Sequence, residues 1–543
     1  MVVPELRPWR AAGPHVVRIA DAVRPRLARA AGTVRPRLAR LAAAAGPRFA
    51  RPDRPGAPRV PRGARPKTRR FAATAATAGL ALAAGVVTAA GPWDSSGQRT
   101  AERDRAVALQ AARGADHGGA PARAGTPPRG PRGVPPAASV LTGLGSTAAT
   151  VKSAPGGKAL GTVLDPLLKN PALGRLSAAV VDVATGERLY GAGSGDALVP
   201  ASTTKIATAV AALSAMGADH RLTTRTVYEP DTGEVVLVGG GDPTLTAREE
   251  AGGSASLRDL AERTAAALAG RGVREVTLSY DTTLYEGTTT HPIGVNPNIA
   301  AVTPLMVDEA RTDGSTSGPA PRAADPAAAA ARTFGDLLGK HGVKVTPPGP
   351  SKATARAATL AAVSSPPLSA LVERMLTDSD NDLAEALARH TALATGGSAD
   401  FAGAGEAVTA RLKHLGLPLE GAGVEIKDGS GLDRRGRLTA DLLTALLVEA
   451  GAPDRPGLRP ALTGLPVAGF TGTLAGRYAD GAAGTVRAKT GTLTGVNTLA
   501  GTVVDKDGRL LAFAFLANGT TGPAAAQSAL DRAATALSAC GCR

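Results

Sequence analysis

The sequence is poor in the residues from which several common kinds of functional site are built. It has only two cysteines in 543 residues, which excludes a disulfide-built scaffold and a cysteine zinc site. Its seven histidines are scattered and form no His-Glu-x-x-His pattern, so we expect neither a metal nor another cofactor. Aromatic residues make up only 3% of the chain, so flat surfaces for stacking bases or sugars must be sparse.

Acidic residues are nearly absent from the first 70 residues, and this explains most of the net charge of +16. Residues 1–70 contain 17 Arg and one Lys against three acidic residues, so the rest of the chain is almost neutral. A basic tail on a neutral body gives no basic face for nucleic acid, and we expect no such partner. The Arg/Pro/Ala composition is typical of a disordered cytoplasmic tail, although a basic repeat at residues 23–29 and 34–40 would also suit anionic lipid.

Charge is also absent from residues 71–91, which are mostly Ala, Val, Leu, Gly and Thr. This length is sufficient to cross a bilayer, and the arginines before it would keep the N-terminus inside and all that follows outside. We therefore expect a transmembrane signal anchor, with the body extracytoplasmic at the cell membrane. The alternative is a signal peptide cleaved after Ala90, which would leave a secreted protein, and the pair Arg69-Arg70 resembles a twin-arginine signal.

Residues 92–161 have no sustained hydrophobic period and are rich in Gly, Pro, Ala and Arg. This composition predicts a flexible stalk that would hold the following body near the membrane. The two cysteines, Cys540 and Cys542, lie at the other end of the chain. We expect no function for this pair, and a labile disulfide, which an oxidising location permits, is the alternative.

A Ser-x-x-Lys motif lies at Ser202 and Lys205, at the start of a predicted helix that runs to Leu213. Residues three apart share a helix face, so the Ser202 hydroxyl and the Lys205 amine can meet. This pair suits a serine nucleophile with a lysine base, provided that burial or nearby positive charge keeps the amine partly neutral. Taken alone, the spacing also fits an ordinary solvated helix face.

Two later segments carry complementary polar groups. Ser379-Asp-Asn381 lies between apolar segments, where it fits a helix N-cap, or a hydroxyl that relays a proton beside an amide that binds a substrate amide. Lys489-Thr-Gly-Thr492 falls on a strand before a predicted hairpin at residues 499–515. It is either an ordinary strand entering a turn or a place for an ammonium and hydroxyls beside a substrate carboxylate.

The order of the three motifs is the signature of penicillin-binding proteins and class A β-lactamases. Residues from about 171 to 539 resemble the D-alanyl-D-alanine carboxypeptidase/D-alanyl-D-alanine endopeptidase family, the class C low-molecular-mass penicillin-binding proteins. Ser202 and Ser379 are 177 residues apart, which matches the long insertion of this family and exceeds what a compact β-lactamase needs. Three further segments also resemble the family, namely residues 237–245, 428–432 and 472–474.

The resemblance implies an α+β fold, with a penicillin-binding/β-lactamase-like transpeptidase domain in which helices flank an antiparallel sheet. We assign this catalytic domain to residues 162–216 and 364–543, interrupted by a large β-rich insertion at residues 217–363. The insertion is expected to form one or two satellite domains without a catalytic cluster. Asp242-Pro243 within it is expected to be a turn.

The resemblance also implies an acyl-enzyme mechanism. Ser202 would attack the carbonyl between the two D-alanines of a peptidoglycan stem peptide, with Lys205 as its base. Ser379 would relay the proton to the leaving amine, and water would then release the acyl group. β-Lactams would acylate the same serine.

Binding of the substrate is assigned to the other motif residues in the same way. Asn381 would orient the substrate amide, while Lys489, Thr490 and Thr492 would hold the terminal carboxylate. Gly491 would let the peptide lie close against the strand. The backbone amides of Ser202 and Thr492 would form the oxyanion hole.

Three other functions compete with this interpretation, and the sequence counts against the first two. A β-lactamase would need a deacylating carboxylate, and no Glu-x-x-Leu-Asn segment follows the Ser-Asp-Asn motif. A Ser-His-Asp hydrolase would need a Gly-x-Ser-x-Gly elbow, which is missing. A membrane-tethered wall-binding protein that no longer turns over stays open, because a fold does not guarantee its activity.

Overall fold

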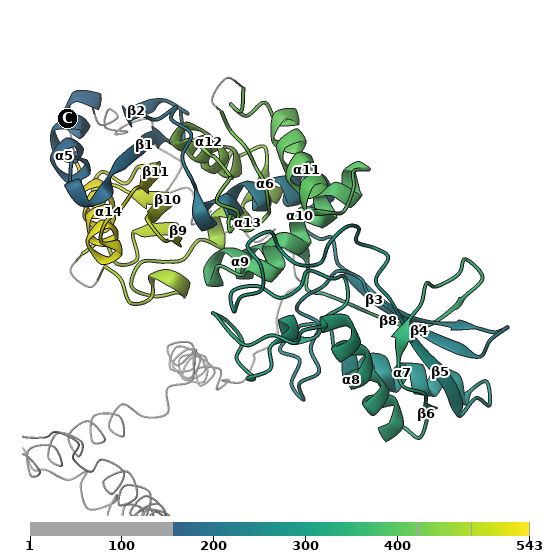
Figure 1. Cartoon of the computed structure of the whole chain (residues 1–543). Helices are drawn as coiled ribbons and strands as arrows, with labels where there is room; N and C mark the ends of the chain where they lie inside the picture. Colours follow the sequence, from purple (N-terminus) through teal and green to yellow (C-terminus); the bar gives the residue numbers. More distant parts are fainter. Residues whose placement is uncertain (1–155, 421–422, 479–480, 542–543) are drawn as a thin grey trace, which may run out of the picture. The chain divides into compact units, whose positions relative to one another are not determined.

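The computed structural model describes residues 156–420, 423–478 and 481–541, all within one compact unit (Figure 1). The expected basic tail at residues 1–70, the membrane segment at residues 71–91 and nearly all of the stalk at residues 92–161 lie outside these ranges. Within the described ranges, no helix combines the length and apolar character needed to cross a membrane. The first described helix, α5 (Gly157–Leu168), begins in the last residues assigned to the stalk.

A five-stranded antiparallel sheet joins the two ends of the described chain. Its order is β2-β1-β11-β10-β9. The strands are β1 (Arg175–Asp182), β2 (Arg188–Ala192), β9 (Val486–Leu493), β10 (Val496–Val504) and β11 (Leu510–Asn518). The predicted hairpin at residues 499–515 is confirmed, since β10 pairs with β11, and β1 and β2 form a second antiparallel pair. The edge strand β9 carries the Lys-Thr-Gly motif.

The two faces of this sheet have side chains of different size because successive residues of a strand point to opposite faces. One face presents large residues such as Phe513 and Phe515 to α5 and α14. The other presents mainly alanines, such as Ala512 and Ala514, which let α6 and α12 approach closely. The helices of this part of the chain, besides α5, are α6 (Thr204–Met216), α9 (Leu368–Asp378), α10 (Asn381–Thr395), α11 (Phe401–His414), α12 (Ala440–Gly451), α13 (Pro460–Thr463) and α14 (Pro523–Ala539).

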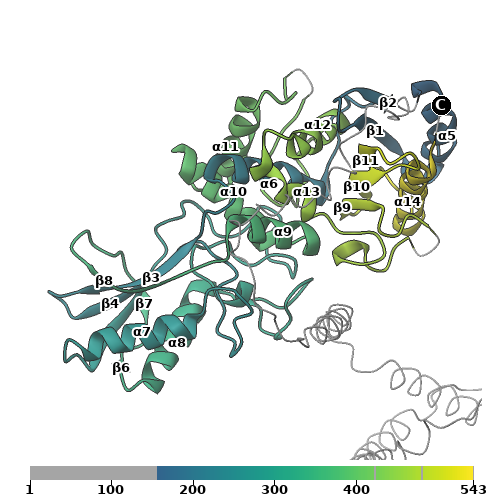
Figure 2. The ribbon, with the colours of Figure 1, turned by 180° about the vertical axis from the view of Figure 1, so that it is seen from behind.

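The insertion forms a second sheet of mixed direction, with the order β6-β5-β4-β3-β8 and β7 paired to β5. The strand β4 is antiparallel to β3 and parallel to β5. The helices α7 (Leu257–Ala269) and α8 (Pro326–Lys340) pack on one side of it (Figure 2). The strands are β3 (Thr223–Glu229), β4 (Glu234–Val238), β5 (Glu275–Asp281), β6 (Lys344–Val345), β7 (Gly349–Pro350) and β8 (Ala358–Ser364).

Two smaller expectations have clear outcomes. Asp242 does begin a turn, because its Oδ1 accepts hydrogen bonds from the backbone N–H and the hydroxyl of Thr244, at 2.8 and 2.6 Å. Cys540 is buried and disulfide-bonded, so the alternative interpretation of the cysteine pair is the one found here. Cys542 itself lies outside the described residues.

Candidate active site

Ser202 lies in a strained turn at the start of α6. A short 3-10 turn, η2 (Ala201–Thr203), leads directly into this helix. Ala201 adopts a φ of +48°, a left-handed conformation that costs free energy for any residue with a Cβ. Such strain persists only where the surroundings hold it, and here it sets the position of the adjacent Ser202.

Lys205 lies one helical turn further on and is completely buried. Its Nζ is 3.2 Å from Ser202 Oγ, 2.6 Å from Asn381 Oδ1 and 2.9 Å from the carbonyl oxygen of Ser430. The structure therefore brings the first two sequence motifs together. It also adds a partner, the Ser430 carbonyl, to which the sequence had assigned no role.

The surroundings of Lys205 bring the pKa of its amine close to neutral pH. Burial lowers the pKa of Lys205 from its ordinary value to about 8. Nearby carboxylates oppose this shift, namely Asp428, Glu385, Asp380 and Asp382. A lysine with this pKa can serve as a base near neutral pH.

The Ser430 carbonyl is held by a loop that two buried carboxylates organise. Glu385 accepts the backbone N–H groups of Gly429 and Ser430, while Asp428 accepts those of Gly431 and Asp433. A Cβ on Gly431 would lie 1.9 Å from the carbonyl oxygen of Ala201, so only glycine fits there. The segment 428–432, to which the sequence had assigned no role, thus packs against Lys205 and against the turn at residues 201–203 that holds Ser202, which we call the nucleophile turn.

The Ser-Asp-Asn motif joins two helices. α9 ends at Asp378, and Ser379 follows in a left-handed conformation with a φ of +59°. Asp380 caps α10 by accepting the N–H of Leu383 at 3.0 Å, so the capping interpretation is right for this residue. Ser379 and Asn381 on either side of it line the pocket that contains Ser202.

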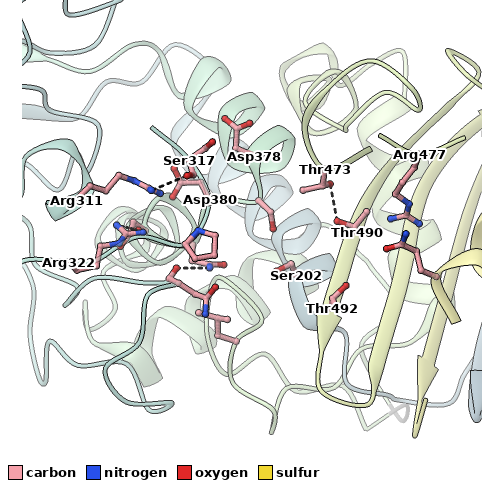
Figure 3. Close-up of a pocket in the computed structure, with 18 residues that line it drawn as sticks. Ser202, Arg311, Ser317, Arg322, Asp378, Asp380, Thr473, Arg477, Thr490 and Thr492 are labelled. Atoms are coloured by element: carbon pink, nitrogen blue, oxygen red, sulfur yellow. Dashed lines mark hydrogen bonds and ion pairs between the residues drawn. The ribbon is translucent and has the colours of Figure 1, made fainter. Parts of the chain in front are cut away.

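The Lys-Thr-Gly strand lies on the other side of the nucleophile. Thr490 and Thr492 line the pocket, and the Thr490 hydroxyl donates to Thr473 Oγ1 at 2.9 Å (Figure 3). Lys489 is completely buried, and its Nζ donates to the Thr490 carbonyl at 2.8 Å. Burial, with a contribution from Lys205, lowers its pKa well below the usual value.

Gly491 allows close packing between β9 and the turn that holds Ser202. A Cβ at this position would lie 2.1 Å from Thr498 Oγ1 and 2.9 Å from the Pro200 carbonyl oxygen. The space where a Cβ would lie is therefore filled by the Thr498 hydroxyl and by the segment that leads to Ser202. This glycine admits the turn of Ser202 against β9.

The pocket at Ser202 has a volume of about 410 Å³ and receives residues from both parts of the chain. Figure 3 shows Arg311 and Arg322, from the insertion, facing Ser202 and β9 across it. The insertion, which was expected to form one or two satellite domains, therefore contributes residues to this pocket. The remaining lining residues are Asn298, Ser317, Gly318, Pro319, Asp378, Ser379, Asp380, Asn381, Asp382, Leu432, Thr473, Arg477, Thr490, Thr492 and Gln527.

Loops of the insertion also bind the Ser-Asp-Asn motif and the residue that follows it. The carbonyl oxygen of Asn298 accepts a hydrogen bond from Asn381 Nδ2 at 2.8 Å, which turns the amide oxygen of Asn381 toward Lys205. Arg322 pairs with Asp382 at 2.9 Å, and Asp382 also accepts the N–H of Ala300 at the same distance. These loops have no sequence periodicity and no motif, so no sequence signal pointed to them.

Two buried clusters in the described part of the chain have the residue types of cation ligands, but their atoms are already used. In the first, His291 Nε2 lies 3.0 Å from Asp428, and backbone N–H groups bond Asp428 and Glu385. In the second, arginines pair with all three carboxylates, namely Glu309, Asp380 and Asp382. Neither arrangement leaves a donor set pointing at an empty centre.

Sequence comparisons agree with this arrangement over most of the described chain. The sequence model of the D-Ala-D-Ala carboxypeptidase 3 (S13) family matches residues 160–320 and 305–538. A carboxypeptidase of Mycobacterium tuberculosis is 38% identical over 441 residues, which cover 78% of this chain and 90% of the relative. The carboxypeptidase DacB of Mycolicibacterium smegmatis is 38% identical over 404 residues, covering 71% and 85% of the two chains.

The fold agrees as well. The crystal structure of penicillin-binding protein 4 of Haemophilus influenzae superposes with a TM-score of 0.57 and 20% sequence identity, covering 70% of this chain and 98% of that one. The likeness shows the penicillin-binding/β-lactamase-like α+β fold. From the family match and the mycobacterial relatives it follows that this chain belongs to the D-Ala-D-Ala carboxypeptidase 3 family of serine peptidases.

Proposed function

We propose that this member of the family hydrolyses D-alanyl-D-alanine peptide bonds of peptidoglycan stem peptides through an acyl-enzyme on Ser202. The observation that carries the proposal is the set of contacts around the Lys205 amine. Two acceptors, Asn381 Oδ1 and the Ser430 carbonyl, lie within 2.9 Å of Nζ, and the third contact is Ser202 Oγ. A neutral amine has two hydrogens, which the two acceptors take, so its lone pair is left facing the serine hydroxyl.

The proton movements follow from this geometry. As Ser202 Oγ forms its bond with the carbonyl carbon of the substrate, its proton passes to Lys205 Nζ. The resulting ammonium is stabilised by the same two acceptors and by the buried carboxylates of Asp428 and Glu385. Ser379 lies in the same pocket, and its hydroxyl makes no hydrogen bond to another described side chain, which suits transfer of the proton to the leaving amine.

The substrate is held by groups on both sides of Ser202. We assign the terminal carboxylate to the hydroxyls of Thr490 and Thr492, with the buried Lys489 amine holding the Thr490 carbonyl between them. The backbone amides of Ser202 and Thr492 are assigned to the oxyanion, where the loss of one donor costs a factor of about 100 to 1,000 in rate. The same chemistry serves a carboxypeptidase, which releases D-alanine, and an endopeptidase, which releases a cross-linked side-chain amine.

β-Lactams are proposed as inhibitors that acylate the same serine. The penicillin-binding protein 4 of Haemophilus influenzae has also been solved in complex with a β-lactam, with a TM-score of 0.53 and 22% identity to this chain. That complex supports the proposal at the level of the shared fold. The three motifs in one pocket support it at the level of the site.

Labelled β-lactam and a stem pentapeptide test the proposal together. Wild-type protein should take up the label and release free D-alanine, and Ser202→Ala should do neither. Equal labelling of both proteins would reject Ser202 as the nucleophile. Labelling without any release of D-alanine or cross-linked product would favour a binding protein that no longer turns over.

We also propose that the body works outside the cytoplasmic membrane, anchored by residues 71–91, with residues 1–70 against anionic lipid on the inner side. The length of the uncharged segment and the arginine excess before it support this location. The mass of the mature N-terminus from cells tests it. A chain that starts after Ala90 would replace the anchor by a cleaved signal peptide and a secreted body.

A further inference from the structure

A strained turn of the insertion lies behind the Ser-Asp-Asn segment. Three consecutive residues with a Cβ, Asp308, Glu309 and Ala310, have φ values of +50°, +55° and +56°. A run of left-handed residues other than glycine is rare because each one costs free energy, and such strain tends to collect at functional positions. The side chain of Glu309, at the centre of the run, is only 2% exposed.

The segment 241–245 holds this turn from behind. The carbonyl oxygens of Leu245 and Pro243 accept the backbone N–H groups of Asp308 and Glu309, at 2.7 and 3.0 Å. The Asp242 turn shapes the accepting segment. The Gly-Gly-Gly-Asp-Pro-Thr-Leu stretch, which the proposed mechanism does not use, thus has a structural role, because it keeps Glu309 in place.

Glu309 in turn contacts three arginines. Arg374 of α9 donates to Oε1 and Arg311 donates to Oε2 at 2.7 Å. Arg322 donates to the Glu309 carbonyl oxygen at 2.5 Å, and its guanidinium lies 3.9 Å from Oε2. The Glu309 side chain thus links an arginine of α9 to two arginines of the insertion.

Two of the arginines reach the residues on either side of Asn381. Arg374 lies 3.5 Å from Asp380, and Arg322 lies 2.9 Å from Asp382. Both aspartates are at most 6% exposed. Asn381 is therefore flanked by two carboxylates, each held by an arginine that also contacts Glu309.

We propose that Glu309 is a positioning residue that acts through Arg374 and Arg322 on both neighbours of Asn381 and so fixes the amide against Lys205. The proposal rests on the proposed function, since it assigns the lysine as the base. It makes the insertion a working part of the active site, although Glu309 does not touch the substrate.

Glu309→Gln keeps the shape of the side chain but replaces an acceptor of arginine by an amide. We expect the rate constant of acylation by a fluorescent penicillin to fall by about tenfold or more, while the dissociation constant of the preceding non-covalent complex changes by less than about threefold. Glu275→Gln is the matched control, because Glu275 is also an insertion carboxylate paired to a cation, Lys344 at 2.8 Å, but is 64% exposed. This control should acylate like the wild type.

Arg374→Gln tests the same proposal from the arginine side and can replace Glu309→Gln if that variant does not fold. Its side chain is 33% exposed, so the substitution is more easily tolerated. It should lower the acylation rate in the same way, and the double variant should lose less than the product of the two single losses, because both act on one path.

A lower melting temperature with an unchanged acylation rate would overturn the proposal, since Glu309 would then be a purely structural residue. Independent, multiplicative losses in the double variant would also overturn it. Absence of label on the wild-type protein is a different outcome, because it rejects the proposed function rather than the role of Glu309.

Discussion

At the residue scale, the proposed chemistry depends on one buried amine. In the proposed mechanism Lys205 must be neutral to accept the proton of Ser202, yet its three contacts within 3.2 Å also suit the ammonium that would result. Burial favours the neutral form, and the carboxylates around it favour the charged form. Their balance leaves the amine able to take up and give back a proton in one catalytic cycle.

The pKa of about 8 for Lys205 sets the expected pH dependence of acylation. Because this pKa lies below the ordinary value, the neutral amine is present above about pH 8 and is lost as the pH falls. The acylation rate should therefore rise about tenfold per pH unit up to pH 8 and then level off. Stopped-flow labelling with a fluorescent penicillin from pH 5.5 to 9.5 measures this.

Circular dichroism at each pH is the control for folding in that experiment. A profile that is already flat from pH 6 would mean that the base has a much lower pKa than the surroundings of Lys205 give it. A profile that rises only above pH 10 would mean that the carboxylates outweigh the effect of burial.

At the element scale, close packing between β9 and the nucleophile turn fixes the distance from Ser202 to the Lys-Thr-Gly strand. The Thr498 hydroxyl donates to the Pro200 carbonyl at 2.8 Å, directly beside Gly491. A larger residue at Gly491 must push the turn away from the strand. The oxyanion donors assigned to Ser202 and Thr492 would then no longer converge on one atom.

Gly491→Ala should accordingly lower the stability by about 1–3 kcal/mol through overpacking. We also expect the acylation rate to fall by about tenfold or more, because a displacement of the nucleophile has a large effect on rate. Thermal unfolding and labelling with β-lactam measure the two effects. Gly161→Ala is the matched control, since a Cβ at that position in α5 has no atom within 4 Å.

If Gly491→Ala acylates as fast as the wild type, the glycine does not control the position of Ser202. If Gly491→Ala and Gly161→Ala lose stability and acylation rate equally, the cause is a general effect of replacing glycine and not the packing of Gly491 against the turn of Ser202.

The elements also show how far the sequence could predict the site. Ser202, Lys205, Ser379, Asn381 and the threonines of β9 were predicted from motifs, because their spacing is local and their chemistry is specific. All of these residues except Lys205 line the pocket. Lys205 is hydrogen-bonded to two of them, Ser202 and Asn381. Sequence patterns report what one helix or strand can present, and these residues lie at the ends or edges of such elements.

Other parts of the site could not be predicted, for a physical reason. Asn298, Arg322 and Glu309 lie on loops of the insertion, far along the chain from Ser379, and act through hydrogen bonds and ion pairs that have no period. The buried state of Lys489 and the packing role of Gly491 depend on which segments meet β9. These contacts are decided by the tertiary fold, which the spacing of the motifs does not encode.

At the scale of the whole molecule, the first described helix already belongs to the hydrophobic core. The hydrophobic clusters begin with α5, where Leu160, Leu164 and Leu168 pack under α14 and the five-stranded sheet. The family match also begins at residue 160. The catalytic unit should therefore fold and work without the tail, the proposed anchor and the stalk.

Two truncations test where the catalytic unit begins. A chain that starts at residue 156 should release D-alanine from a soluble stem pentapeptide within about twofold of the full-length rate, because it keeps every residue to which the proposed mechanism gives a role. A chain that starts at residue 170 loses the three leucines of α5, and each such side chain contributes about 1.5–3 kcal/mol when fully buried. Its melting temperature should fall sharply, even though no residue of the site is removed.

Cell fractionation of the same proteins separates catalysis from location. The full-length chain should sediment with membranes, and the chain that starts at residue 156 should not, while both turn over the soluble peptide. An inactive 156 truncation that still folds would mean that the first 155 residues take part in the chemistry. Equal melting temperatures for the two truncations would mean that α5 adds nothing to the core, against the complete burial of Leu160 and Leu164.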